Sequence, residues 1–128
     1  MWLYRDDYFD MGQADNFVGF VYLITNTETG KKYIGKKRFK KVQTYQKNKK
    51  KRRRMVESDW KEYTGSNDQL NEDVANGHTI RKEILHLCTS LGWCSYYETL
   101  EILQRNAIQD DAYYNNWVSC KIHRKHLK

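Results

Sequence analysis

The clearest hydrophobic pattern lies in residues 18–36, where a β-branched and aromatic run precedes a polar turn. Residues 18–25 show no helical periodicity and therefore predict a strand. Residues 26–30 are polar and end in glycine, which is typical of a hairpin loop. A second short apolar centre, Tyr33-Ile34, follows, and Gly35 closes it. The pattern predicts one antiparallel hairpin with Tyr22 on the first arm and Tyr33 on the second.

The rest of the pattern predicts helices around one further strand. Residues 58–63 resemble a helix start with Ser58 as N-cap, and residues 68–75 predict a short helix capped by Ser66 or Asn67. Residues 79–87 predict a third strand, and residues 1–16 an arm or short helix that packs its aromatic side chains on the body. The longest helix is predicted at residues 96–107, with Ser95 as its N-cap.

The length and composition indicate a single domain spanning residues 1–128. No apolar run approaches the length of a membrane span, and the first residues lack the pattern of a secretory signal. The odd count of three cysteines, Cys88, Cys94 and Cys120, favours reduced thiols and an intracellular location.

The positive charge is concentrated in one segment. Residues 31–54 hold fourteen Lys or Arg residues and no acidic one, whereas the other nine of the 23 basic residues share the remaining chain with all 16 acidic residues. Such a run repels itself, so we expect the arm at about 37–57 to be disordered or partly helical until a polyanion neutralises it. The predicted nucleic-acid contacts are Lys37, Lys40, Lys41, Lys49, Lys50, Lys51, Arg52, Arg53 and Arg54.

Two carboxylates on the longest predicted helix are candidates for a metal ligand. Glu98 falls in the predicted first turn, and Glu101 lies one turn further on the same flank. Either would also complement the helix dipole without any catalytic role. Phosphodiester hydrolysis needs charge stabilisation and an activated water, and Mg²⁺ takes only one or two protein carboxylates. A single glutamate is therefore sufficient for this chemistry.

Several of these motifs, in this order, resemble the GIY-YIG nuclease family, and in particular a branch found in phages. The resemblance covers roughly residues 17–127 and is carried by Phe20-Val21-Tyr22, Tyr33-Ile34-Gly35-Lys36-Lys37-Arg38-Phe39, Ser58-Asp59-Trp60 with Tyr63 and Gly65-Ser66, Ile84-Leu85, Tyr97-Glu98 and Tyr114-Asn115.

The resemblance implies an α/β (α+β) fold, with a three-stranded antiparallel sheet flanked by helices, and hydrolysis of DNA with Mg²⁺ or Mn²⁺. It assigns Tyr22 to activating or orienting the attacking water and Tyr33 to positioning water or phosphate. Glu98 would bind the metal, and a basic residue would stabilise the phosphate. Lys36 or Lys37 could also lower a tyrosine pKa through its positive charge. Asn115 would hydrogen-bond near the site, with Asn116 an equal candidate from spacing.

Two positions depart from the family pattern. Phe20 replaces the first-motif glycine, and the usual arginine on a helix after the hairpin has no counterpart, because position 45 is Tyr45. The arginine role is assigned to Arg38, with Arg52, Arg53 and Arg54 as alternatives. These departures also motivate a second hypothesis, a nucleic-acid-binding module of the same fold without catalytic activity. If the chain associates, a symmetric homodimer is the expected assembly.

Overall fold

The structure is a computed structural model that describes residues 1–119 and 121–127. Its elements in chain order are β1 (Trp2–Tyr4), β2 (Asp7–Tyr8), the 3₁₀ helix η1 (Met11–Asn16), β3 (Gly19–Asn26), β4 (Lys32–Arg38), β5 (Lys40–Lys47), β6 (Lys50–Glu57), α1 (Asp68–Ala75), β7 (Ile80–Cys88), α2 (Leu91–Gln104) and the 3₁₀ helix η2 (Arg124–Leu127).

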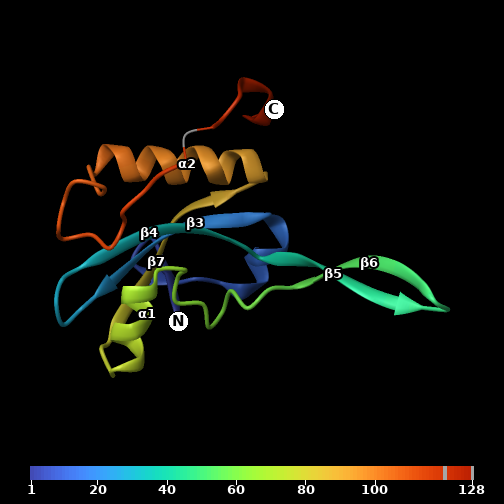
Figure 1. The fold of residues 1–128 in the computed structure, drawn as a ribbon, viewed down its shortest axis with the longest axis horizontal. Helices are drawn as coiled ribbons and strands as arrows, with labels where there is room; N and C mark the ends of the chain where they lie inside the picture. Colours follow the sequence, from blue (N-terminus) through green and yellow to red (C-terminus); the bar gives the residue numbers. More distant parts are fainter. Residues whose placement is uncertain (120, 128) are drawn as a thin grey trace.

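The main sheet has the strand order β2-β1-β7-β3-β4, and α2 covers one face while α1 lies against the other (Figure 1). The predicted sheet flanked by helices is confirmed, and its three antiparallel strands are β7, β3 and β4. The sheet has five strands rather than three, because β1 adds parallel to β7 and β2 pairs antiparallel with β1. Among the described residues, no helix is long and apolar enough to cross a membrane.

The central strand β3 is buried on both faces, which explains its continuous apolar sequence. Phe20, Tyr22 and Ile24 point into the aromatic core under α1, with Trp2, Phe39 and Trp60 among their neighbours. Val21 and Leu23 point into the core under α2, which also holds Cys88 and Cys94, both free thiols. Cys120 lies outside the described residues.

The predicted hairpin 18–36, the helix 68–75 and the strand 79–87 are confirmed within a few residues. Asn67, not Ser66, caps α1, because its side chain accepts a hydrogen bond from the backbone N–H of Leu70. The predicted helix at 58–63 is wrong: this segment is a turn, held by Lys82, whose Nζ donates to the carbonyls of Lys61 and Tyr63.

The prediction for the basic arm is also wrong in structure. Residues 40–57 form an antiparallel two-stranded ribbon, β5–β6, that extends away from the body (Figure 1). A two-residue loop, Asn48-Lys49, joins the strands, and both residues have positive φ, as a type I′ turn requires. Hairpin geometry therefore orders this segment despite its charge.

The predicted start of the longest helix is wrong by five residues. Helix α2 begins at Leu91 with Ser90 as its N-cap, and the Ser90 hydroxyl accepts a hydrogen bond from the backbone N–H of Trp93. Ser95 consequently lies inside the helix, and Glu98 lies beyond the first turn. Both serines satisfy the local capping pattern, so the local sequence alone does not separate them.

Gly35 allows the closest side-chain approach in the sheet. A β-carbon at this position would overlap the Tyr22 hydroxyl oxygen and lie 2.5 Å from Tyr22 Cζ. Gly35→Ala is therefore expected to lower the free energy of unfolding by about 1–3 kcal/mol, measured by urea denaturation. Gly12→Ala is the control, because its nearest contact is the flexible Asp10 side chain at 3.3 Å. Equal stability of the two variants would contradict the close approach.

Candidate active site

The two hairpin tyrosines lie on the same face of the sheet. Tyr22 pairs in register with Gly35, and Tyr33 pairs with Ile24, so both side chains point toward the α1 face. Their ring centroids are 6.2 Å apart. The Tyr22 ring crosses the edge strand β4 at Gly35 and is 1% exposed, whereas the Tyr33 hydroxyl reaches Ser66 Oγ at 3.0 Å.

A third tyrosine, Tyr63, completes the group, although the sequence predicts no role for it. The Tyr63 ring centroid lies 6.0 Å from that of Tyr22 at an angle of 81°. Lys37 Nζ lies 4.0 Å from the Tyr63 centroid and 2.6 Å from Asp59 Oδ1. Lys37, a predicted nucleic-acid contact, is therefore engaged within the protein. The only sequence signal for Tyr63 is its place in the Ser58-Asp59-Trp60 motif.

Burial favours the neutral form of Tyr22 and of Tyr33. It raises the pKa of Tyr22 well above 10, and the neighbouring Tyr63, Tyr33 and Glu98 raise it further. The pKa of Tyr33 is also raised, mainly by burial, although its hydrogen bond with Ser66 acts in the opposite direction. A neutral phenol is a weak proton acceptor, so a nearby cation is needed before either tyrosine can assist proton transfer at neutral pH.

Glu98 enters the same region from α2. Together with Tyr33, Ile34, Ser66 and Asn115 it lines a pocket of about 340 Å³ at the β4 edge of the sheet. Burial raises the pKa of Glu98, and the charge of Lys36 partly offsets this effect. Within the described ranges, the Glu98 carboxylate has no hydrogen-bond or ion-pair partner, which leaves it available to a cation.

Glu101 has a different environment from Glu98, although the sequence places both on one flank of the helix. Glu101 Oε1 lies 2.8 Å from His86 Nε2, and Oε2 accepts a 2.9 Å hydrogen bond from Arg105 Nε. Burial alone would raise the pKa of Glu101, but these hydrogen bonds and the charges of Arg105 and His86 lower it. Glu101 is thus a structural ion-pair partner.

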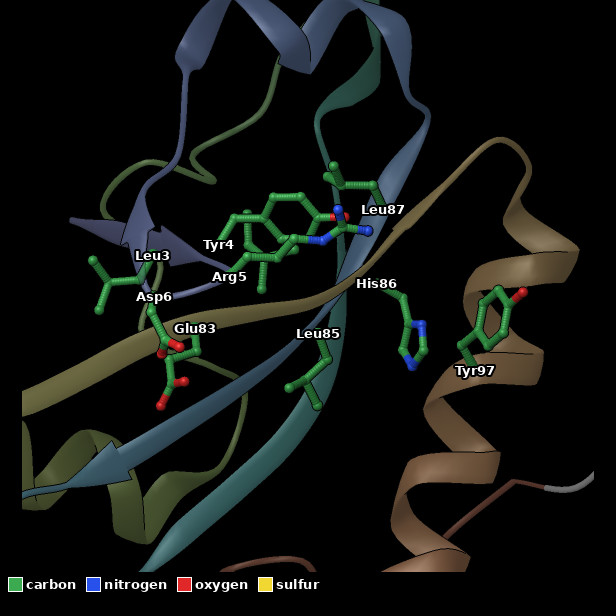
Figure 2. A pocket seen from close by; sticks show the side chains of 10 residues that line it. Leu3, Tyr4, Arg5, Asp6, Glu83, Leu85, His86, Leu87 and Tyr97 are labelled. Carbon is green, nitrogen blue, oxygen red and sulfur yellow. The ribbon is translucent and has the colours of Figure 1, made fainter.

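The ring of His86 lies beside Tyr97 at the margin of another hollow, of about 490 Å³, shown in Figure 2. Strands β1 and β7 and the segment around Arg5 contribute most of its lining. None of the catalytic residues expected from the sequence lines this hollow.

Two basic residues of β4 lie on the α2 side of the sheet edge. Lys36 Nζ donates a 2.7 Å hydrogen bond to Ser95 Oγ. Lys36 and Arg38 share the lining of a hollow of about 550 Å³ with Lys41, Cys94 and Ser95. Arg38 Nε is buried without a hydrogen-bond partner among the described residues. Arg52, Arg53 and Arg54 lie instead on the ribbon.

Asn115 fixes the edge strand at the site. Its side-chain oxygen accepts a hydrogen bond from the Ile34 backbone N–H, and its amide nitrogen donates to the Ile34 carbonyl, each at 2.9 Å. The neighbouring Asn116 is exposed. The structure thus separates two residues that spacing leaves equal, and it gives Asn115 a positioning role on β4.

Glu98 is the only acidic side chain among the described residues that line the pocket at the β4 edge. Among the described residues, no group of three or more His, Cys, Asp or Glu side chains could hold a metal ion. Zn²⁺ and Ca²⁺ prefer more protein ligands, whereas Mg²⁺ keeps several waters and binds one or two carboxylates, and Mn²⁺ shares the preference of Mg²⁺ for carboxylate and water oxygens. The unpaired, half-buried Glu98 therefore fits Mg²⁺ or Mn²⁺.

A two-tyrosine hairpin at a sheet edge, with a glutamate entering from a flanking helix, defines a GIY-YIG-type domain. The chain belongs to the family described as "Putative endonuclease segE, GIY-YIG domain", whose model matches residues 2–118. The resemblance inferred from the sequence is confirmed by this match. The comparisons with curated proteins and with solved structures found no match.

Asn115→Asp is expected to destabilise the protein, because one carboxylate oxygen would face the Ile34 carbonyl without a hydrogen to share. The expected loss is about 1–3 kcal/mol of unfolding free energy at pH 7, from urea titration followed by circular dichroism. The control Asn116→Asp introduces the same charge on an exposed side chain and is expected to change stability by less than about 0.5 kcal/mol. A reversed order would show that Asn116 holds the strand.

Proposed function

We propose that the protein is a metal-dependent DNA endonuclease that hydrolyses phosphodiester bonds at the β4 edge. The observation that carries this proposal is the convergence of Tyr33, Glu98 and Asn115 on one pocket, with Tyr22 directly behind Gly35. Family membership supports a nuclease in general, and the geometry supports the finer assignment.

Each side chain has a role that its surroundings favour. Glu98 would hold Mg²⁺ or Mn²⁺, and this cation would supply positive charge against the scissile phosphate. Lys36 and Arg38 would bind phosphate oxygens, since both lie in the hollow beside Ser95. Tyr33 would orient the attacking water or the phosphate through its hydroxyl, while Tyr22 would relay the proton of that water once a bound cation offsets its raised pKa.

The replacement of the first-motif glycine by Phe20 is compatible with activity. Phe20 is fully buried and packs against Trp2, with ring centroids 4.9 Å apart, and against Phe39, at 4.8 Å. Its side chain fills the core under α1 and does not line the pocket. The substitution therefore changes the packing beneath the site and leaves the pocket wall intact.

Glu98→Gln is expected to reduce metal-dependent cutting of supercoiled plasmid by at least about a hundredfold, because the metal ligand loses its charge. Tyr22→Phe is expected to lose about 10²–10⁴-fold in rate through loss of proton transfer. Cutting would be measured with Mg²⁺ and with Mn²⁺, with and without chelator, beside a DNA-binding assay.

The matched control is Glu101→Gln, which changes the same charge one turn along α2. It should retain cutting within about tenfold, because Glu101 is paired with His86 and Arg105 outside the pocket. Cutting that survives Glu98→Gln but not Glu101→Gln would reverse the assignment. DNA binding without cutting by the parent protein, on several DNAs and with both metals, would instead identify a catalytically inactive binding module.

The raised pKa of Glu98 also predicts how stability depends on pH. The folded state binds this proton more tightly than the unfolded chain, so the contribution to stability is complete below the ordinary value of 4.5 and is lost as pH rises through the raised value. Glu98→Gln is therefore expected to raise the melting temperature at pH 7 by a few degrees, with the gain vanishing near pH 4.

Glu101→Gln should have the opposite effect, since the pKa of Glu101 is lowered and its charge stabilises the folded state at pH 7. Added Mg²⁺ or Mn²⁺ should raise the melting temperature of the parent but not of Glu98→Gln, because only a bound cation stabilises the fold. A cation-induced shift that persists in Glu98→Gln would place the metal elsewhere.

A further inference from the structure

The β5–β6 ribbon has two chemically different faces. Directly paired residues of an antiparallel ribbon point to the same side, and the register pairs Gln43 with Arg54 and Tyr45 with Arg52. One side, which we name the basic face, carries five basic side chains and no acidic one; it consists of Lys41, Gln43, Tyr45, Lys47, Lys50, Arg52, Arg54 and Val56. The other side, the mixed face, consists of Lys40, Val42, Thr44, Gln46, Lys51, Arg53, Met55 and Glu57.

Polar side chains on the basic face are organised before any ligand arrives. Arg54 Nε donates a 2.8 Å hydrogen bond to Gln43 Oε1, and the Arg54 guanidinium lies 4.8 Å from the Tyr45 ring centroid. This contact holds the guanidinium over the aromatic ring while its two terminal nitrogens remain available as donors. A simple contact with phosphates would need only charge, whereas an oriented Arg-Gln pair matches the donor and acceptor pattern of base edges.

The shape of the ribbon suits the major groove of duplex DNA. Each strand has eight residues, so the ribbon is about 26 Å long at about 3.3 Å per residue. A B-DNA major groove, about 12 Å wide, admits a two-stranded ribbon, and the type I′ loop keeps the tip narrow. The major groove of duplex RNA is too deep and narrow for such an insertion.

The base of the ribbon is fixed to the core beside the candidate active site. Phe39, at the junction of β4 and β5, is buried, and its ring centroid lies 5.0 Å from that of Trp60. Ser58, at the end of β6, donates hydrogen bonds from its hydroxyl to the Arg38 carbonyl, at 2.6 Å, and from its backbone N–H to the Phe39 carbonyl, at 2.9 Å. The ribbon therefore leaves the body in a defined direction.

The basic face continues into the site. Lys41, its residue nearest the core on β5, shares the hollow at the α2 side with Arg38 and Lys36. Lys36, which shares this hollow, also donates a hydrogen bond to Ser95 on α2, the helix that carries Glu98. A duplex bound along this path would contact the basic face and the site together.

We propose that the ribbon enters the major groove with its basic face toward the bases, and that Arg52, Arg54 and Gln43 select the DNA sequence bound. The proposal rests on the proposed function for its DNA substrate, but it concerns recognition and not cutting. The mixed face, whose basic residues include Lys51 and Arg53, would lie toward phosphates and solvent.

The test is a binding selection from randomised DNA duplexes, performed in chelator so that no cutting is needed. The parent protein is compared with R52Q/R54Q on the basic face and K51Q/R53Q on the mixed face, each of which removes two charges from the same exposed strand. Circular dichroism checks that all three proteins are folded. The parent should enrich a short motif, and R52Q/R54Q should lose discrimination at it by about ten- to a hundredfold.

The matched variant K51Q/R53Q should keep the motif and bind all sequences more weakly to a similar extent. Arg54→Lys keeps the charge but loses the stacked fork, so it should lose the preference while retaining the salt dependence of the parent. The proposal is overturned if the parent enriches no motif, if both double variants keep the same motif, or if duplex RNA competes as well as duplex DNA. A selected motif without metal-dependent cutting would support the ribbon assignment and refute the proposed catalytic function.

Discussion

The close approach of Tyr22 to Gly35 is the constraint on which the site depends. Any side chain at position 35 would occupy the space of the phenol, so the edge strand must be bare where the ring crosses it. This crossing takes a side chain from the buried central strand to the edge of the sheet, where Glu98 arrives from the opposite face. Gly35 of the Tyr33-Ile34-Gly35 motif thus leaves room for the Tyr22 ring. It thereby allows residues from the two faces of one sheet to meet at its edge.

An edge strand has a row of unpaired backbone groups, so a site built on it needs further contacts that fix the strand in place. Beyond its pairing with β3, β4 is held at its start, at Ile34 and at its C-terminal end. At the start, the backbone of Lys32 hydrogen-bonds with that of Ala112 and Tyr114. Asn115 makes both backbone hydrogen bonds that a further strand would make to Ile34. At the other end, Phe39 enters the aromatic core and ties β4 to the start of the ribbon. The Asn115 side chain thereby occupies the open edge of β4 at Ile34, and the C-terminal end of β4 continues into the ribbon.

Local patterns predicted the elements whose cause is local. The hairpin at 18–36, helix α1 and strand β7 follow from apolar runs, a capping asparagine and turn residues. The ribbon escaped prediction because both of its faces contact solvent, so no alternation marks it, and its type I′ turn contains Asn48-Lys49 without a glycine. The place of Tyr63 depends on Lys82, which is distant in sequence, and the start of α2 required a choice between two equally good caps.

Sequence spacing does not distinguish Glu98 from Glu101 as a metal ligand, so only the resemblance selected Glu98. Their spacing is that of one helix flank, and their difference comes from neighbours: β4 and the segment around Asn115 for Glu98, and His86 of β7 for Glu101. Glu98 is left unpaired in a place where burial raises its pKa, which disfavours the folded state at neutral pH. A stabilising role would have selected a partner for this carboxylate, as Glu101 has. An unpaired, half-buried carboxylate beside neutral phenols and a basic hollow is instead the arrangement that a cation and a phosphate would complete, because the cation would pair with Glu98 and the phosphate with the basic residues.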